Sequence, residues 1–376
     1  MGGTALGCQI DMRILITGAC GVTPRAIARS LAVSRHFSAA TLIGTDRGGN
    51  WYGFYEGLYD RVYRVPGTSD PGYAEAIAEI CATEAIDVAV ISPETEVRYW
   101  SGRSFPVPTL LPSAGVVGVA ISKRKLYDAL RGTGLIPSYG VVARDDLVRR
   151  SGLDFGDGPV WLRDFADASS SGTGAIKVGD AEQAYAWAVL HPEIEEYMVA
   201  EYLPGGNFAC NLLFAEDQLL KTGCYERLEY FGGHLVVSGV SGNISRGRVM
   251  TDDRLIAAGE EAIRLIARQF GEPAHGLFTV DLKGAADGSP KITEINIRHT
   301  AATSALAAGG SNLAEAQVLA SLGRHDEIGE VTVAPSGATV ILRDIDGVPL
   351  LAGEEEIAVG DFVARPVGRS AGAGRA

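Results

Sequence analysis

The most constraining feature of the sequence is a pair of neighbouring segments in which apolar and polar side chains alternate. The segments are residues 276–284 (GLFTVDLKG) and 290–298 (PKITEINIR), separated by the turn AADGS. Alternation with a period of two is typical of a β-strand, because successive side chains point to opposite faces of a sheet. The two segments therefore predict a β-hairpin with one largely apolar face and one polar face.

The polar face of this hairpin carries carboxylate, amide and guanidinium groups. Glu294, Asn296 and Arg298 share one face of the second strand, and Asp281 can join them from the first. Asp and Asn are depleted in strands, so their presence here calls for a reason. Mg²⁺ is one such reason, since it takes a few oxygen ligands from the protein and the rest from phosphates and water. A solvated outer face, with Arg298 neutralising Glu294, is the alternative interpretation of the hairpin alone.

Length, composition and charge exclude several classes of protein. A chain of 376 residues with 46% hydrophobic positions can bury a substantial core in two or three domains. The net charge of −13, without a cluster of Lys and Arg, argues against nucleic acid as a partner. No window approaches the ~20 apolar residues of a membrane span, and the N-terminus lacks a secretory pattern, so we expect a cytoplasmic protein without a membrane partner. The five cysteines are scattered and predict neither a disulfide framework nor a structural zinc site.

The pattern along the chain predicts three domains. From residue 12, strands and helices alternate as in a parallel α/β sheet, which indicates a Rossmann-like domain over residues 12–115. A small α+β lobe is expected over 116–203, and a larger lobe of long strands, carrying the hairpin, over 204–364. Residues 1–11 and 365–376 lack hydrophobic periodicity, and we expect both to be disordered.

The order of motifs along the chain resembles that of the ATP-grasp superfamily. The matching features, in chain order, are a helix with Lys125, a strand with Arg163, a Ser/Gly loop at 169–174, a hinge at 201–205 (EYLPG), Asp281, and Glu294-x-Asn296-x-Arg298. The similarity is closest to the ATP-binding half of carbamoyl-phosphate synthetase large chains and covers about residues 12–325. It implies an ATP-grasp fold, of mixed α/β and α+β class, behind an N-terminal Rossmann-like domain.

The resemblance implies a role for each matched residue. Arg298 would be catalytic, stabilising charge on the transferred phosphoryl group, because phosphoryl transfer depends on positioning and electrostatics. Asp281, Glu294 and Asn296 would bind Mg²⁺, with Mn²⁺ as the alternative metal. The implied ATP-binding residues are Lys125, Arg163, Ser169, Ser170, Ser171, Gly172, Glu201, Tyr202, Leu203 and Asn207. Asn207 stands near the place where the family commonly has a glutamate for the ribose hydroxyls.

Three further residues are candidate contacts for the remaining substrates. Arg227 and His234 lie where the resemblance places the acceptor side of the site, and His299 directly follows Arg298. A histidine packed beside the sheet is the alternative interpretation of His299.

The resemblance implies an ATP-dependent carboxylate-amine ligase that forms an acyl phosphate and releases ADP and phosphate. Its partners would be a small-molecule carboxylate and an amine, and a homodimer is one option for its assembly. A bicarbonate-activating enzyme of the carbamoyl-phosphate type is an alternative within the class. A nicotinamide-dependent oxidoreductase is the alternative from another class, since Gly18, Gly21 and Asp46 partly match a dinucleotide fingerprint whose full GxGxxG is absent. A non-catalytic nucleotide-binding regulator is the third option.

Overall fold

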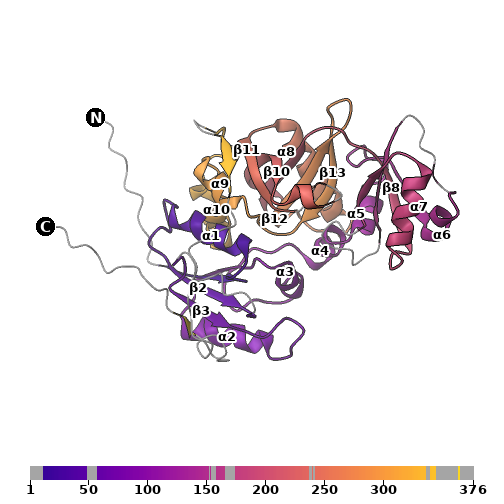
Figure 1. The fold of residues 1–376 in the computed structure, drawn as a ribbon. Helices are drawn as coiled ribbons and strands as arrows, with labels where there is room; N and C mark the ends of the chain where they lie inside the picture. Colours follow the sequence, from indigo (N-terminus) through magenta and orange to yellow (C-terminus); the bar gives the residue numbers. More distant parts are fainter. Residues whose placement is uncertain are drawn as a thin grey trace.

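Three β-sheets organise the chain (Figure 1). The computed structural model describes residues 12–48, 57–151, 153, 158–165, 174–236, 239, 242–335, 339–343 and 363–364. The predictions made for residues 1–11 and 365–376, and for Ser169, Ser170, Ser171 and Gly172, lie outside these ranges. Within them, no helix combines the length and the apolarity that crossing a bilayer needs.

The first sheet has the order β15-β3-β2-β1-β4 and is mainly parallel. Its strands are β1 (Arg13–Thr17), β2 (Thr41–Asp46), β3 (Arg61–Arg64), β4 (Val88–Val90) and β15 (Val363–Ala364). The helices that alternate with them are α1 (Val22–Ala32), α2 (Tyr73–Thr83) and α3 (Glu94–Trp100). Parallel sheets are covered on both faces, which explains why Ile14, Leu15 and Ile16 are all 0% exposed. The parallel pairing of β1 with β2 and β4 confirms the predicted α/β unit.

The last described strand returns to this first sheet. β15 pairs antiparallel with β3, although residues 363–364 belong by sequence to the predicted region 204–364. The end of that region therefore adds an edge strand to the N-terminal sheet.

The second sheet has four antiparallel strands in the order β5-β8-β6-β7. These are β5 (Tyr139–Ala143), β6 (Val160–Asp164), β7 (Ile176–Val178) and β8 (Glu196–Glu201). Helices α6 (Arg144–Val148) and α7 (Ala181–Leu190) contribute Leu147, Ala184 and Ala188 to its buried cluster. α7 begins after Asp180, whose carboxylate accepts a hydrogen bond from the backbone N–H of Gln183.

Two short helices precede this sheet, α4 (Ala114–Ala120) and α5 (Lys123–Ala129). The sequence predicts one helix over residues 122–133, and the structure shortens it. Ser122 caps the start of α5 by accepting from the backbone N–H of Lys125. Gly132 and Gly134, with φ of 77° and 80°, follow its end, and such left-handed backbone is incompatible with a continuing helix.

The third sheet has six antiparallel strands in the order β13-β12-β9-β10-β11-β14. The strands are β9 (Asn207–Ala215), β10 (Gln218–Tyr230), β11 (Ile244–Met250), β12 (Gly276–Gly284), β13 (Pro290–Asn296) and β14 (Val340–Leu342). The turn at Glu216 and Asp217 joins β9 to β10, with φ of 46° and 69° at these residues. Left-handed backbone at both positions matches the twist of a tight hairpin.

Helices cover both faces of the six-stranded sheet. α8 (Asp253–Arg268) packs on one face, where Gly259 lies against Leu212 and Val280. α9 (Thr303–Ala308) and α10 (Leu313–Ser321) pack on the other, where Gly223 lies against side chains of both helices. Two 3₁₀ turns, η2 (Gly233–Leu235) and η3 (His325–Glu327), complete the described elements.

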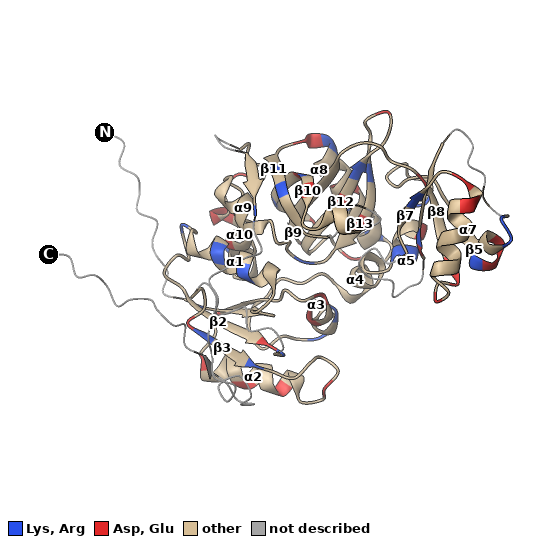
Figure 2. Cartoon of the chain, in the orientation of Figure 1, with Lys and Arg blue, Asp and Glu red and all other residues tan. Residues whose placement is uncertain are grey.

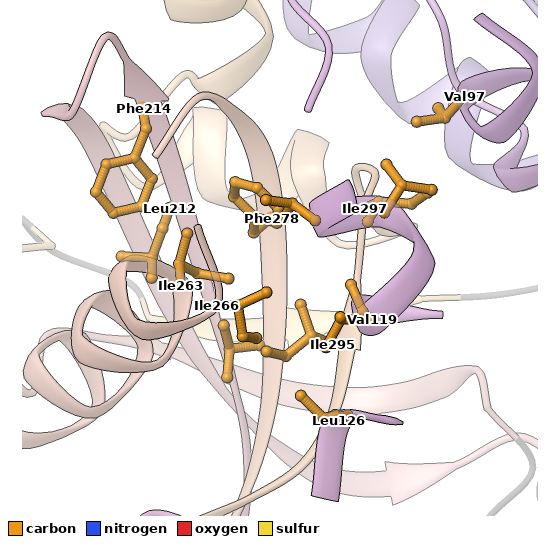
Figure 3. Close-up of a cluster of buried hydrophobic side chains, with 14 of the residues drawn as sticks. Val97, Val119, Leu126, Leu212, Phe214, Ile263, Ile266, Phe278, Ile295 and Ile297 are labelled. Carbon is orange, nitrogen blue, oxygen red and sulfur yellow. The ribbon is translucent and has the colours of Figure 1, made fainter. Parts of the chain in front are cut away.

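A single apolar cluster connects the three sheets. It includes Leu15 of β1, Met198 of β8 and Phe278 of β12, all at most 1% exposed. Figure 3 shows its centre, where Ile263 and Ile266 of α8 meet Leu212, Phe278 and Ile295 of the six-stranded sheet, with Val119 and Leu126 nearby. Burying each large aliphatic side chain is worth about 1.5–3 kcal/mol. This burial fixes the apolar face of β12 and β13 inward.

Candidate active site

The β12–β13 hairpin forms with its polar residues on one face. Asp281 lies directly opposite Glu294, and Thr279 lies opposite Asn296. Directly opposed residues in an antiparallel pair share a face. Asp281, Glu294, Asn296 and Arg298 are all half-buried, so none of them sits on a fully solvated outer surface. The structure thus brings the four residues together as the alternation predicts.

A β-bulge at Thr293 adds one residue to β13. Asp281 pairs with Glu294, but the next residue, Leu282, pairs with Ile292, so Thr293 is left over. The Thr293 hydroxyl donates to the carbonyl oxygen of Asp281 at 3.2 Å. Because of the bulge, Ile292 and Ile295 both enter the core, at 0% and 2% exposed. Strict alternation would have placed Ile292 beside Glu294, and bulges of this kind re-aim side chains next to active sites.

A buried polar network holds the chain at Arg298, two residues after β13 ends. The hydroxyl of Thr279 lies 2.7 Å from the side-chain oxygen of Asn211 and 2.9 Å from the carbonyl oxygen of Arg298. The Asn211 amide donates to the Gly223 carbonyl at 3.0 Å, and both Asn211 and Thr279 are 0% exposed. Buried polar groups with partners restrict the backbone. Asn211 was not among the residues predicted from the sequence. An Asn inside an apolar strand was the signal that could have identified it.

Asp281 is ion-paired with Arg227 of β10. The Arg227 Nη2 to Asp281 Oδ1 distance is 2.5 Å, and the two side chains are 15% and 17% exposed. Burial, together with the facing negative charge of Glu294, raises the pKa of Asp281 despite the attraction of Arg227. Burial would lower the pKa of Arg227, but the attraction of Asp281 outweighs it and the pKa is raised. Two close carboxylates and the guanidinium groups of Arg227 and Arg298 thus act on one another at this point of the sheet.

The donor set suits a hard divalent cation. Two carboxylates and one amide oxygen on a rigid sheet are oxygen ligands of the kind Mg²⁺ prefers. Among the described residues, no group of three or more His, Cys, Asp and Glu side chains could hold a metal by itself. A metal at Asp281, Glu294 and Asn296 would therefore need further oxygens from a ligand and water.

Two cations from outside the six-stranded sheet face this hairpin. Arg163 of β6 is 8% exposed and Lys123 of α5 is 7% exposed. Burial lowers the pKa of Lys123, and Arg163 and Glu294 are the charges with the next largest effects on it. Burial raises the pKa of the Tyr127 phenol to about 12, and the charge of Arg163 acts to lower it. Figure 2 shows basic residues on α5, on β7 and around β12, where the two antiparallel sheets approach each other.

The structure favours Lys123, and not the predicted Lys125, as the lysine of α5 that faces the hairpin. Lys125 is exposed, whereas Lys123 is buried, and Arg163 and Glu294 are among the charges that act on it. Side chains two positions apart on a helix point in nearly opposite directions. Because α5 begins at Lys123, immediately after the Ser122 cap, it is Lys123 that points inward.

The predicted hinge leads from β8 to β9 and is hydrogen-bonded to the end of β12. After Leu203, which is 5% exposed, the Gly205 N–H donates to the Gly284 carbonyl at 2.9 Å, and the Gly284 N–H donates to the Gly206 carbonyl at 3.0 Å. A Cβ atom on Gly205 would lie 2.7 Å from the Gly284 oxygen, so this close approach requires glycine.

The polar groups near the hinge have partners of their own. The Glu201 carboxylate accepts from the Ser138 hydroxyl at 3.0 Å, and Lys177 lies 4.1 Å from the centre of the Tyr202 ring. The Asn207 side-chain oxygen accepts from Lys283 Nζ at 3.3 Å. Asn207 is thus tied to the polar face of β12 through Lys283.

The two candidate histidines lie in different environments. His299 is 1% exposed, and its ring nitrogens lie 2.7 Å from Gln317 Oε1 and 3.3 Å from the Thr303 hydroxyl. Packing beside the sheet therefore accounts for His299 better than a substrate contact. His234 is exposed on η2, and among the described residues it forms no hydrogen bond or ion pair that links it to the hairpin.

The structure is similar to solved ligases of low sequence identity. Phosphoribosylamine–glycine ligase from Thermotoga maritima aligns over 88% of this chain and 80% of that chain, with 18% identity and a TM-score of 0.61. L-amino acid ligase from Bacillus licheniformis aligns over 83% and 74%, with 12% identity and a TM-score of 0.58. The chain has the ATP-grasp fold.

A third ATP-grasp structure carries a nucleotide. N5-carboxyaminoimidazole synthetase from Staphylococcus aureus complexed with ADP aligns over 89% of this chain and 81% of that chain, with 13% identity and a TM-score of 0.55. The sequence itself matches no protein-family model and no curated protein. At these identities the ATP-grasp likeness concerns the fold.

The burial of His299 predicts a pH-dependent stability. Burial lowers its pKa to about 4, below the ~6.5 of an unfolded chain, so its stabilising effect is complete above pH 6.5 and is lost as the pH falls toward 4. At 1.36 kcal/mol per pKa unit, the wild type should lose about 2 kcal/mol more than His299→Gln between pH 7 and pH 5. Urea unfolding at both pH values measures this, with His234→Gln as the exposed control. Equal losses in wild type and His299→Gln would contradict the assignment.

Proposed function

We propose that the protein is an ATP-dependent carboxylate-amine ligase that works through an acyl phosphate. The observation that carries the proposal is the opposed pair Asp281 and Glu294, with Asn296 and Arg298 on the same side and buried Lys123 and Arg163 nearby. Carboxylates suit a metal, and cations suit phosphates and a second carboxylate. The transfer of a phosphoryl group to a carboxylate needs carboxylates and cations close together in one half-buried site.

The proposed nucleotide site extends from the hairpin to the hinge. Lys123 and Arg163 would contact the phosphates, backbone groups of Glu201 to Leu203 would hold the adenine, and Asn207 would lie near the ribose. Asp281, Glu294 and Asn296 would hold Mg²⁺, which when bound neutralises charge on the phosphates. The Ser169–Gly172 loop remains a predicted phosphate contact.

The reaction would proceed in two steps. A carboxylate oxygen of the first substrate attacks the γ-phosphorus of ATP, the bond from this phosphorus to the β-phosphate oxygen breaks, and ADP leaves. The amine of the second substrate then attacks the acyl carbon, phosphate leaves, and the amine nitrogen gives up a proton. Arg298 would stabilise the negative charge that develops on the transferred group. Arg227, which is ion-paired with Asp281, would provide a second guanidinium on the acceptor side of the site.

The alternative from another enzyme class has less support. A dinucleotide site would use Gly18, Gly21 and Asp46, but Asp46 already accepts from the backbone N–H groups of Cys20 at 3.0 Å and Gly48 at 2.9 Å. A Cβ atom on Gly18 would lie 2.4 Å from Pro93, so packing accounts for that glycine. Bicarbonate activation stays the alternative within the ligase class. We further propose the three domains predicted over residues 12–115, 116–203 and 204–364, each built around one of the three sheets, with β15 returning to the first.

The products of the reaction test this proposal. We expect a screen of amino acids in pairs, with Mg-ATP, to find combinations that release ADP and phosphate in equal amounts. Asp281→Asn and Glu294→Gln should each reduce the rate about 10²-fold or more, since charge stabilisation of this kind is worth several kcal/mol. Glu75→Gln, on the exposed side of α2, is the control and should keep full activity. Release of AMP and pyrophosphate, or full activity in the Asp281→Asn and Glu294→Gln double variant, would eliminate the mechanism.

Two lysines on one helix test the nucleotide site. Lys123→Met should raise the Kd of a non-hydrolysable Mg-ATP analogue at least tenfold, a loss of about 1.4 kcal/mol, because a buried phosphate contact is removed. Lys125→Met, on the exposed side of α5, should change it less than twofold. Calorimetric titration measures both, and thermal unfolding verifies that each variant folds. The reverse pattern would restore Lys125 to the site.

A further inference from the structure

A second cavity lies between the N-terminal sheet and the six-stranded sheet. Its volume is about 490 Å³, and it is lined by the residues after α1, by Lys221 of β10, by α9 and α10, and by the segment 328–333. Lys221 and Arg227 lie on the same strand but six positions, or roughly 20 Å, apart. Leu306 and Leu313 pack on Gly223 between them. The cavity is therefore separate from the proposed active site, and the proposed reaction leaves it without a role.

Four charged side chains surround this cavity, two of each sign. Arg35 and Lys221 are the cations, and Glu315 and Glu330 are the carboxylates. Lys221 is 5% exposed and Glu315 is 6% exposed. Burial and nearby Arg35 lower the pKa of Lys221, whereas Glu315 and Glu330 act to raise it. Among the described residues no ion pair joins any two of these four side chains, and all four line the cavity.

The buried charges retain unused hydrogen-bonding capacity. Lys221 Nζ donates to the Glu330 carbonyl at 2.7 Å, and within the described part of the chain this is the single acceptor for its three N–H groups. One oxygen of Glu315 accepts from the Arg35 backbone N–H at 2.7 Å and from the Ser34 hydroxyl. Its other oxygen has no donor among the described residues. A ligand with an acceptor for Lys221 and a donor for Glu315 would use this capacity in charge-assisted hydrogen bonds.

We propose that this cavity binds a zwitterionic molecule of about dipeptide size. Its carboxylate would meet Lys221 and Arg35, and its ammonium group would meet Glu315 and Glu330. Val33, Ile328 and Val333 give the wall an apolar part that suits an aliphatic side chain. A volume of about 490 Å³ falls in the range of small-molecule sites, of roughly 300–1,000 Å³. A simple anion would leave both carboxylates unpaired and would be repelled by them.

The proposal rests on the cavity alone and is tested without nucleotide. The probe is L-alanyl-L-leucine, titrated calorimetrically into the whole protein, beside its N-acetyl derivative, which lacks the ammonium group, and its C-terminal amide, which lacks the carboxylate. We expect saturable binding of one dipeptide per chain and at least tenfold weaker binding of either derivative. Equal binding of all three, tighter binding of inorganic phosphate, or no saturable binding of the dipeptide would overturn the proposal.

Variants assign the binding to the cavity. Lys221→Met and Arg35→Gln should each weaken dipeptide binding at least tenfold, whereas Arg268→Gln, an exposed arginine of α8, should leave it unchanged. Arg298→Ala should also leave it unchanged, because Arg298 belongs to the proposed active site. Should Lys221→Met fail to fold, Arg35→Gln carries the test alone. Loss of binding in Arg298→Ala with retention in Arg35→Gln would move the dipeptide to the active site, overturning this inference while leaving the ligase proposal intact.

Discussion

The burial of one face of the β12–β13 hairpin against α8, α4 and α5 is the constraint on which the site depends. Ile292, Ile295 and Phe278 are at most 2% exposed on that face. Because strand side chains alternate, fixing the apolar face inward fixes Asp281, Glu294 and Asn296 outward, and a slip of one residue would exchange the two sets. Facing carboxylates repel each other, so the core must hold them together. Apolar burial thus supplies the free energy that offsets the repulsion between charges concentrated at the site.

The second requirement is that charges from separate sheets converge. Lys123 and Arg163 come from α5 and β6, outside the six-stranded sheet, and both are less than 9% exposed. The shared apolar cluster and the contact of Gly205 with Gly284 bring these elements to the hairpin. A chain with a net charge of −13 can therefore present a locally cationic place for phosphates. The same docking of elements forms the second cavity, which is lined by Lys221, Arg35 and two carboxylates.

The sequence predicted those parts of the structure that depend on local periodicity. Alternation located the hairpin and grouped Glu294, Asn296 and Arg298, and the strand and helix order predicted the N-terminal sheet. The bulge at Thr293 could not be predicted, because an extra residue leaves no periodic signal in so short a strand. The choice between Lys123 and Lys125 depends on the residue at which α5 begins, and helix ends are poorly determined by sequence. The burial of His299 depends on contacts between distant segments, which no local pattern contains.

The central claim is that the polar face of β12 and β13 binds a metal-nucleotide complex. A crystal structure of the protein with a non-hydrolysable ATP analogue and Mn²⁺, with anomalous data collected for manganese, tests it most directly. We expect an anomalous peak coordinated by Asp281, Glu294 and Asn296, with the phosphates beside Lys123 and Arg163. A nucleotide bound at the turn of Gly18 and Gly21, or a metal away from these three side chains, would contradict it.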